Sequence, residues 1–196
     1  MADRFRIRLP FVIGAALVAV SASALPCGLE DPSSIAFRRG VLNLAYPESL
    51  HVGTAVWQAQ LAGILPRDAL AQRADLSPEA RGTLRLVKAN GLLRLLAAKI
   101  GGTPDAGPHP KLAIVLLGPV MWSRFEHQDG AVRATVHVDG PENGDVVVVT
   151  DLAAVEAIVG GSLGFAEAVD LGVVRLYGPP EDVAATRTWL THLAHG

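Results

Sequence analysis

The chain has 196 residues, of which 50% are hydrophobic and 18% are charged, and its 17 basic and 19 acidic residues give a net charge of −2. This length allows one domain with a real hydrophobic core, and the slightly acidic balance argues against a nucleic-acid-binding protein. Because the chain has a single cysteine, Cys27, an internal disulfide is excluded.

The first 24 residues have the pattern of an export signal. Three arginines, Arg4, Arg6 and Arg8, precede an apolar run over residues 11–20, and small residues follow it. The apolar core of about 10 to 14 residues is shorter than the roughly 20 needed to span a bilayer. The sequence therefore predicts a signal peptide over residues 1–24, a periplasmic or secreted protein, and no stable transmembrane span after cleavage.

Cleavage leaves 172 residues with 14 basic and 18 acidic side chains, a net charge of −4. Cys27 then lies near the new N-terminus, where a free thiol, a lipid-modified thiol, a mixed disulfide with a partner or a metal ligand all stay open. Pro26 directly before it departs from lipoprotein signals. His51 is the imidazole expected nearest to Cys27, but two ligands alone bind a metal weakly, so no metal site and no cofactor are predicted.

Glycine and proline interrupt the segment Cys27–Tyr46, which predicts an irregular arm with a solvated Arg38–Arg39 pair. Pro47 suits the first turn of a helix that ends near Pro66. Its apolar stripe is expected to face the core, with a partner groove as the alternative, and it consists of Leu50, Trp57, Leu61 and Ile64.

A second helix is predicted to begin at Ser77, Pro78 and Glu79 and to run to about Ile100. Its expected apolar side consists of Leu84, Leu92, Leu95, Leu96 and Ile100, and its expected solvated side of Arg81, Arg85 and Lys88. The alternative for the basic side is an anionic membrane or an acidic partner. The segment Gly101–Pro110 is rich in glycine and proline and predicts a linker.

After the linker the hydrophobic period becomes two, which predicts strands over Leu112–Leu117, Trp122–His127 and Ala131–Val138. Asp129-Gly130 predicts a two-residue hairpin turn that places Glu126 opposite Arg133. One face of this hairpin is then Ser123, Phe125, Val132, Ala134 and Val136, and the other is Arg124, Glu126, Arg133, Thr135 and His137.

The rest of the chain predicts alternating strands and helices. These are a strand Val146–Val149, a helix capped by Asp151 that ends at Val159, a short helix capped by Ser162, a strand Val173–Tyr177, and a final helix from Pro179-Pro180 to about His195. No nucleophile elbow or nucleotide-binding loop is present in the sequence, so no enzymatic activity is predicted.

The order of hairpin, strand, two short helices, strand and closing helix resembles the sterol-carrier-protein-like family over residues 110–195. The spacing of Gly161-Ser162-Leu163, Ala168, Gly172 and Gly178 is also similar to that family's pattern. The resemblance implies a five-stranded sheet covered by helices around an apolar tunnel. Carried onto this chain, the tunnel is lined by Phe125, Val147, Val149, Ile158, Leu163, Phe165 and Trp189, which an ordinary packed core would also contain.

The sequence thus predicts an α+β fold, with a small, mostly antiparallel sheet covered by helices and a helical N-terminal extension. The expected division is an arm with helices over residues 25–108 and a sterol-carrier-like domain over residues 109–196. The predicted function is that of an exported binding protein for an apolar small molecule such as a lipid or fatty acyl chain, without catalysis. The alternative is an accessory protein for an exported enzyme or transporter, whose domain core is filled.

Overall fold

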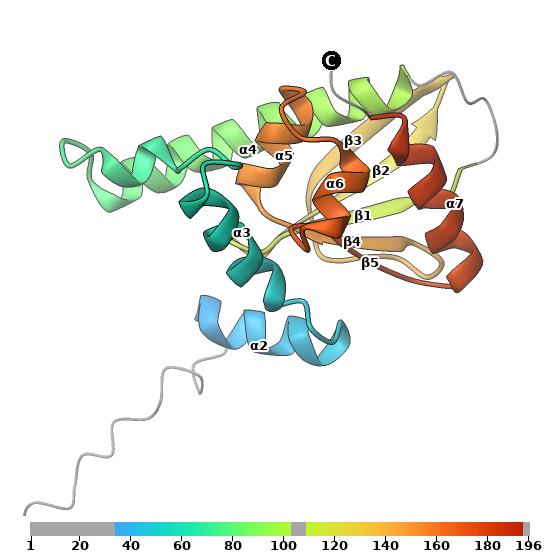
Figure 1. Ribbon diagram of the computed structural model, residues 1–196, viewed down its shortest axis with the longest axis horizontal. Coiled ribbons are helices and arrows are strands. Elements are labelled where there is room, and N and C mark those ends of the chain that lie inside the picture. Colours follow the sequence, from blue (N-terminus) through green and yellow to red (C-terminus); the bar gives the residue numbers. More distant parts are fainter. Residues whose placement is uncertain (1–33, 103–108, 194–196) are drawn as a thin grey trace, which may run out of the picture.

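The computed structural model describes residues 34–102 and 109–193 (Figure 1). The predicted signal peptide, Cys27 and the central part of the predicted linker lie outside the described residues. No helix in the two described ranges is both long and apolar enough to cross a membrane.

The described part has an α+β fold, as predicted. Its elements in chain order are α2 (Ile35–Ala45), α3 (His51–Leu61), the 3₁₀ helix η1 (Ala69–Gln72), α4 (Pro78–Gly101), β1 (Leu112–Leu116), β2 (Met121–Gln128), β3 (Ala131–Val138), β4 (Val146–Thr150), α5 (Leu152–Val159), α6 (Phe165–Asp170), β5 (Arg175–Tyr177) and α7 (Pro180–Thr191).

The five strands form one sheet in the order β3-β2-β1-β4-β5. β1 and β4 run parallel, and the other neighbouring pairs are antiparallel, so the sheet is mostly antiparallel as expected. The predicted hairpin register is confirmed, with Glu126 opposite Arg133. Asp129 and Gly130 both have positive φ, at 53° and 77°, which matches the primed turn that a two-residue hairpin prefers.

The two faces of the sheet have different covers. Helices α4, α5, α6 and α7 cover one face, toward which Ile114 and Val148 point (Figure 1). On the other face the turn between α2 and α3 places Tyr46 against Trp122 and Tyr177, with ring centroids 5.9 and 5.3 Å apart. Because β1 and β4 lie in the middle of the sheet, every residue of these two strands is buried.

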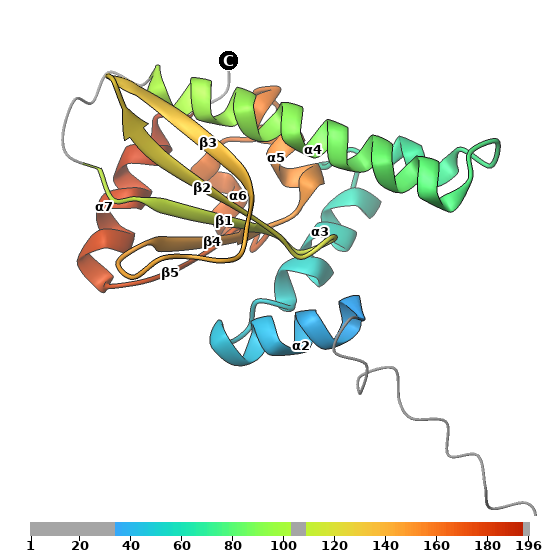
Figure 2. The same ribbon diagram turned by 180° about the vertical axis from the view of Figure 1, so that it is seen from behind.

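Helix α4 begins where the sequence predicts. The Ser77 hydroxyl oxygen accepts a hydrogen bond from the Ala80 N–H at 3.2 Å, and Pro78 occupies the first turn. The C-terminal half of α4 contributes Leu96 and Ile100 to the core. Leu84, expected on the apolar side, is 42% exposed because the N-terminal half of α4 extends past the sheet (Figure 2). Leu95 is 56% exposed because the buried side of the C-terminal half is formed by Leu93, Leu96, Ala97 and Ile100.

The N-terminal segment differs from the prediction. The expected irregular arm contains α2, whose first turn is capped by the Ser34 hydroxyl, 3.0 Å from the Phe37 N–H. The sequence missed this helix because Gly40, inside it, is typical of a helix breaker, although open space surrounds the position.

The expected core stripe of the next helix is also wrong. α3 begins at His51, after a turn that holds Pro47, and it buries the smaller side chains Val52, Val56 and Ala59. The four predicted core residues stay exposed, at 39% for Leu50, 59% for Trp57, 57% for Leu61 and 41% for Ile64. The side of α3 with the small residues packs inward because Gly53 lies against the loop after β1. A Cβ added to Gly53 would be 3.3 Å from the Leu117 side chain.

Smaller corrections concern the ends of the last elements. Gly164, not Ser162, is the N-cap of α6, and the Ser162 hydroxyl instead donates to the Ala157 carbonyl at 3.3 Å. Strand β5 is limited to Arg175–Tyr177, and α7 ends at Thr191.

The helical extension packs into the same hydrophobic core as the sheet. Leu42 and Val52 of the helical extension belong to the same buried cluster as the strands, and so do the α4 residues. The boundary expected at residue 108 therefore does not divide two hydrophobic cores.

A buried ion network on the sheet gives a stability prediction. The Arg124 side chain is 12% exposed and pairs at 3.1 Å with Asp145, whose side chain is fully buried. Arg124→Met leaves that carboxylate without its cation and is expected to lower the free energy of unfolding by about 3 kcal/mol or more in urea titrations.

Lys111→Met is the matched control. Lys111 lies 3.5 Å from Glu126 but is 61% exposed, so its loss is expected to cost about 1 kcal/mol or less. Equal losses in the two variants would contradict the role of the Arg124 pair.

Candidate functional site

The seven residues of the predicted tunnel are all buried. Ile158 and Phe165 line a space between the helices and the sheet that has a volume of about 20 Å³. Such a volume holds about one water molecule and no hydrocarbon chain. Around Ile158 and Phe165 the helices and the sheet therefore pack together with almost no free space.

The seven residues also do not surround one space. Phe125 pairs in register with Leu112 on the face toward α4–α7, whereas Val147 pairs with Tyr177 on the face covered by Tyr46. Val147 and Val149 therefore point away from the helices that were expected to close the tunnel. As ligand contacts, the seven residues stay a prediction.

Trp189 takes part in a ring stack that the sequence did not predict. His109, expected in a linker, stacks on Trp189 with centroids 3.9 Å apart and planes at 1°, and His127 lies 5.5 Å from His109. Burial, together with the nearby His109, lowers the pKa of His127. Within the described ranges, no group of three or more His, Cys, Asp or Glu side chains could hold a metal ion.

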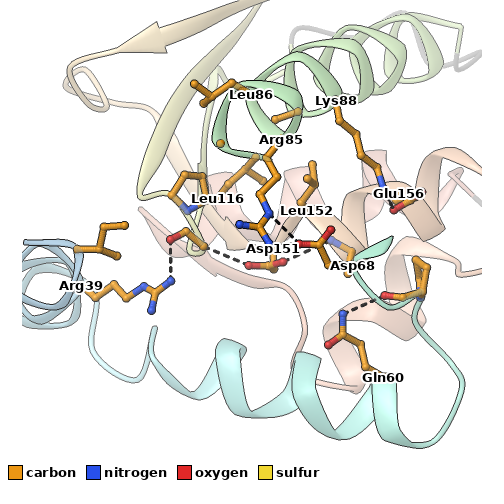
Figure 3. A pocket seen from close by; sticks show the side chains of 17 residues that line it. Arg39, Gln60, Asp68, Arg85, Leu86, Lys88, Leu116, Asp151, Leu152 and Glu156 are labelled. Atoms are coloured by element: carbon orange, nitrogen blue, oxygen red, sulfur yellow. Dashed lines mark hydrogen bonds and ion pairs between the residues drawn. The ribbon is translucent and has the colours of Figure 1, made fainter. Parts of the chain in front are cut away.

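A much larger cavity lies outside the predicted tunnel. It has a volume of about 590 Å³ and lies between α2, α3, the segment that leads into η1, α4, the loop after β1 and the start of α5 (Figure 3). Its apolar lining includes Ile35, Leu86, Ala89, Leu116 and Leu152. Ile35 and Leu86 are also 48% and 39% exposed, which places them at the opening.

Arg39 enters this cavity from α2. Its Nε donates to the Leu117 carbonyl at 2.9 Å and its Nη2 to the Gly118 carbonyl at 2.6 Å. The neighbouring Arg38 donates to the Val120 carbonyl at 2.8 Å. The arginine pair expected in solvent therefore fixes the loop after β1.

Asp151 lies in the middle of the cavity wall (Figure 3). As predicted, it caps α5 and accepts from the Ala153 N–H at 3.4 Å, and it also accepts from the Gly118 N–H at 3.1 Å. Burial raises the pKa of Asp151, although these hydrogen bonds and the charge of Arg39 partly oppose the shift.

The basic side of α4 forms the opposite wall. Arg85 pairs with Asp68 at 2.7 Å, and Lys88 pairs with Glu156 at 2.6 Å. Arg85 is exposed, as expected of a solvated side, although it pairs with the N-cap residue of η1, whereas Lys88 is half-buried against the Glu156 carboxylate of α5.

The polar lining was missed because five separate segments supply it. The signal available in the sequence was the basic side of α4 itself, since only Glu79 is acidic on that helix. A run of unmatched cations beside apolar residues indicates that acidic partners lie elsewhere in the fold. The assembled cavity combines apolar walls with fixed charges, an arrangement suited to holding an amphipathic molecule.

Comparisons with known proteins give a limited likeness. No family model matches the chain, and no curated protein matches it significantly. Sterol carrier protein 2-like 2 from Aedes aegypti is similar in structure, with 22% identity, a TM-score of 0.36, and coverage of 52% of this chain and 94% of that one.

A conserved hypothetical protein from Thermus thermophilus, suggested to be a sterol carrier protein, is similar with 21% identity and a TM-score of 0.36. The match covers 56% of this chain and 88% of that one. At this identity and TM-score the likeness assigns neither a ligand nor a site to this chain.

The buried carboxylate predicts a pH dependence. Because the folded state raises the pKa of Asp151 above its ordinary 3.8, the folded state binds this proton more tightly than the unfolded state. Stability from this group is therefore lost as the pH rises through the folded pKa. Asp151→Asn keeps an oxygen for the Ala153 N–H but has no carboxylate to ionise. The difference in free energy of unfolding, variant minus wild type, is therefore expected to be more positive near neutral pH than at about pH 3.5 in urea unfolding experiments.

Asp75→Asn is the control of opposite sign. Arg73 holds the pKa of Asp75 below its ordinary value, so this exposed variant should lose stability relative to wild type as the pH rises. The interpretation of Asp151 fails if both variants shift in the same direction.

Proposed function

We propose that this chain binds an apolar small molecule, such as a lipid or a fatty acyl chain, in the cavity between α2, α3, α4 and α5. The observation that carries the proposal is the cavity of about 590 Å³ with its largely aliphatic lining. Small-molecule sites in proteins occupy about 300 to 1,000 Å³ and are mostly apolar with a few fixed polar groups. The arginine-rich leader supports the further proposal that binding occurs in the periplasm or outside the cell.

Burial of hydrocarbon supplies the affinity in this proposal. Each methylene removed from water contributes about 0.8 kcal/mol, so a chain of about ten carbons gains roughly 8 kcal/mol before ordering costs. The exposed Ile35 and Leu86 at the opening provide an apolar entrance. Native mass spectrometry of protein purified from its own host is expected to show a co-purified lipid.

Two glycines of α4 provide a matched test of the cavity. Gly82 lines the cavity, and an added Cβ at this position would meet nothing within 4 Å. Gly82→Trp therefore fills the cavity without a clash at Cβ, and it is expected to weaken binding of decan-1-ol about tenfold or more in fluorescence displacement titrations.

Gly91→Trp is the control. Its Cβ would also meet nothing within 4 Å on the same helix, but Gly91 is not among the residues that line the cavity. It should bind decan-1-ol as wild type does. Equal affinity of Gly82→Trp and Gly91→Trp would place the ligand outside this cavity.

A second candidate function is that of an accessory protein for an exported partner. Among the described residues, eleven of the twelve large hydrophobic side chains that stay exposed lie between residues 35 and 95. The range 34–102 carries nine basic and four acidic residues, whereas 109–193 carries five and eleven. An exported protein with an apolar, acidic surface would match the exposed apolar side chains and the basic excess of this range.

A photocrosslinking residue at position 61 tests this candidate in cells of the native host. One discrete protein adduct is expected, and the purified partner should bind Trp57→Ala about tenfold more weakly than wild type, because exposed tryptophans are frequent anchors of interfaces. Position 171, the exposed apolar residue of the other part, is the control. An adduct containing only a second copy of this chain would contradict the candidate.

A further inference from the structure

The wall of the proposed ligand cavity holds two opposite charges, Arg39 and Asp151, and neither forms an ion pair within the described residues. This inference rests on the proposed function and concerns the polar group of the ligand. Arg39 and Asp151 both line the cavity, and both are attached to Gly118, Arg39 to its carbonyl and Asp151 to its N–H. Figure 3 shows Arg39 and Asp151 among the residues that line the cavity.

Gly118 fixes the separation of the two charged groups. An added Cβ on Gly118 would lie 3.2 Å from Oδ2 of Asp151, so any other residue would push the carboxylate away. The carbonyl and the N–H of one peptide segment therefore hold the guanidinium and the carboxylate on the same wall. Such rigid placement is what a preorganised polar subsite needs.

The other charges of the cavity are already matched. Arg85 is paired with Asp68 and Lys88 with Glu156. Within the described residues, neither Arg39 nor Asp151 forms an ion pair, although the charge of Arg39 influences Asp151 through space. The guanidinium has more N–H donors, and the carboxylate more acceptor sites, than their bonds to the backbone use.

The lining as a whole is electrically balanced. It contains the three cations Arg39, Arg85 and Lys88 and the three carboxylates Asp68, Asp151 and Glu156. A ligand with a net charge would therefore meet a like charge as well as an opposite one, and its desolvation would not be repaid in full. An uncharged polar group avoids this cost.

We propose that the ligand's polar group is a hydroxyl, which accepts a hydrogen bond from Arg39 and donates one to Asp151, so that the site selects an apolar alcohol over a free acid or an amine. A hydroxyl is both donor and acceptor and bridges the pair without adding charge. Burial raises the pKa of Asp151, which indicates that its carboxylate lacks the solvation that a ligand O–H would replace.

Three probes with the same decyl chain test the inference: decan-1-ol, decanoate and decylammonium. Affinities are measured near neutral pH by displacement of a fluorescent probe. In wild type, decan-1-ol is expected to bind about tenfold more tightly than either ion, because an ion that pairs with one of Arg39 and Asp151 lies beside the like charge of the other. The chain is constant, so the ratios report the head group alone.

Two variants should change the ratios in opposite directions. Asp151→Asn leaves Arg39 in excess and is expected to raise the preference for decanoate over decylammonium about tenfold. Arg39→Gln leaves Asp151 in excess and should raise the preference for decylammonium by a similar factor. Arg94→Gln is the control, since Arg94 is exposed on α4 and does not line the cavity, and it should keep the wild-type ratios.

A purely structural role for the pair would weaken all three probes together and would overturn the inference, as would tightest binding of decanoate to wild type. If the three probes bind wild type equally, the hydroxyl subsite is wrong while the proposed lipid-binding cavity stands. If none binds, both fail. Should Arg39→Gln not fold, Asp151→Asn, which keeps an oxygen for the α5 cap, decides the outcome.

Discussion

The attachment of α2 to the loop after β1 is the interaction on which the cavity depends. Arg38 and Arg39 hold three carbonyls of this loop, and Asp151 holds the Gly118 N–H from the other side. These bonds join the loop to the helical extension on one side and to the start of α5 on the other. Charge-assisted hydrogen bonds to backbone carbonyls are among the stronger polar contacts in proteins, and here they join segments about eighty residues apart.

The sheet domain could be predicted because its signals are local. Asp129-Gly130 specifies the hairpin turn, alternation specifies which side of β3 is buried, and Asp151 specifies the start of α5. The helical extension was harder, since Val52, Val56 and Ala59 are less apolar as a group than the exposed Trp57, Leu61 and Ile64. Side-chain size decided the packing there, because only the small side of α3 fits against the loop.

The cavity could not be predicted because its parts come together only through long-range contacts. Asp151 was identified as a helix cap, and Arg85 and Lys88 as one side of a helix, but their common location depends on how α4 crosses α5. The seven predicted tunnel residues do not surround one space for a related reason. Val147 and Val149 belong to a strand buried on both faces, where apolar character alone does not tell which face a side chain occupies.

Helix α4 is one continuous helix that runs from the cavity to the β2–β3 hairpin. Its 24 residues span about 36 Å, with the cavity wall at one end and Gly101 at the other. Gly101 lies so close to β3 that an added Cβ would be 3.1 Å from the backbone nitrogen of Val132. This contact fixes the C-terminal end of α4 against β3. The position of the cavity wall therefore depends on the direction that α4 takes from its contact with β3, so a change at Val132 would be felt in a site that lies several helical turns away.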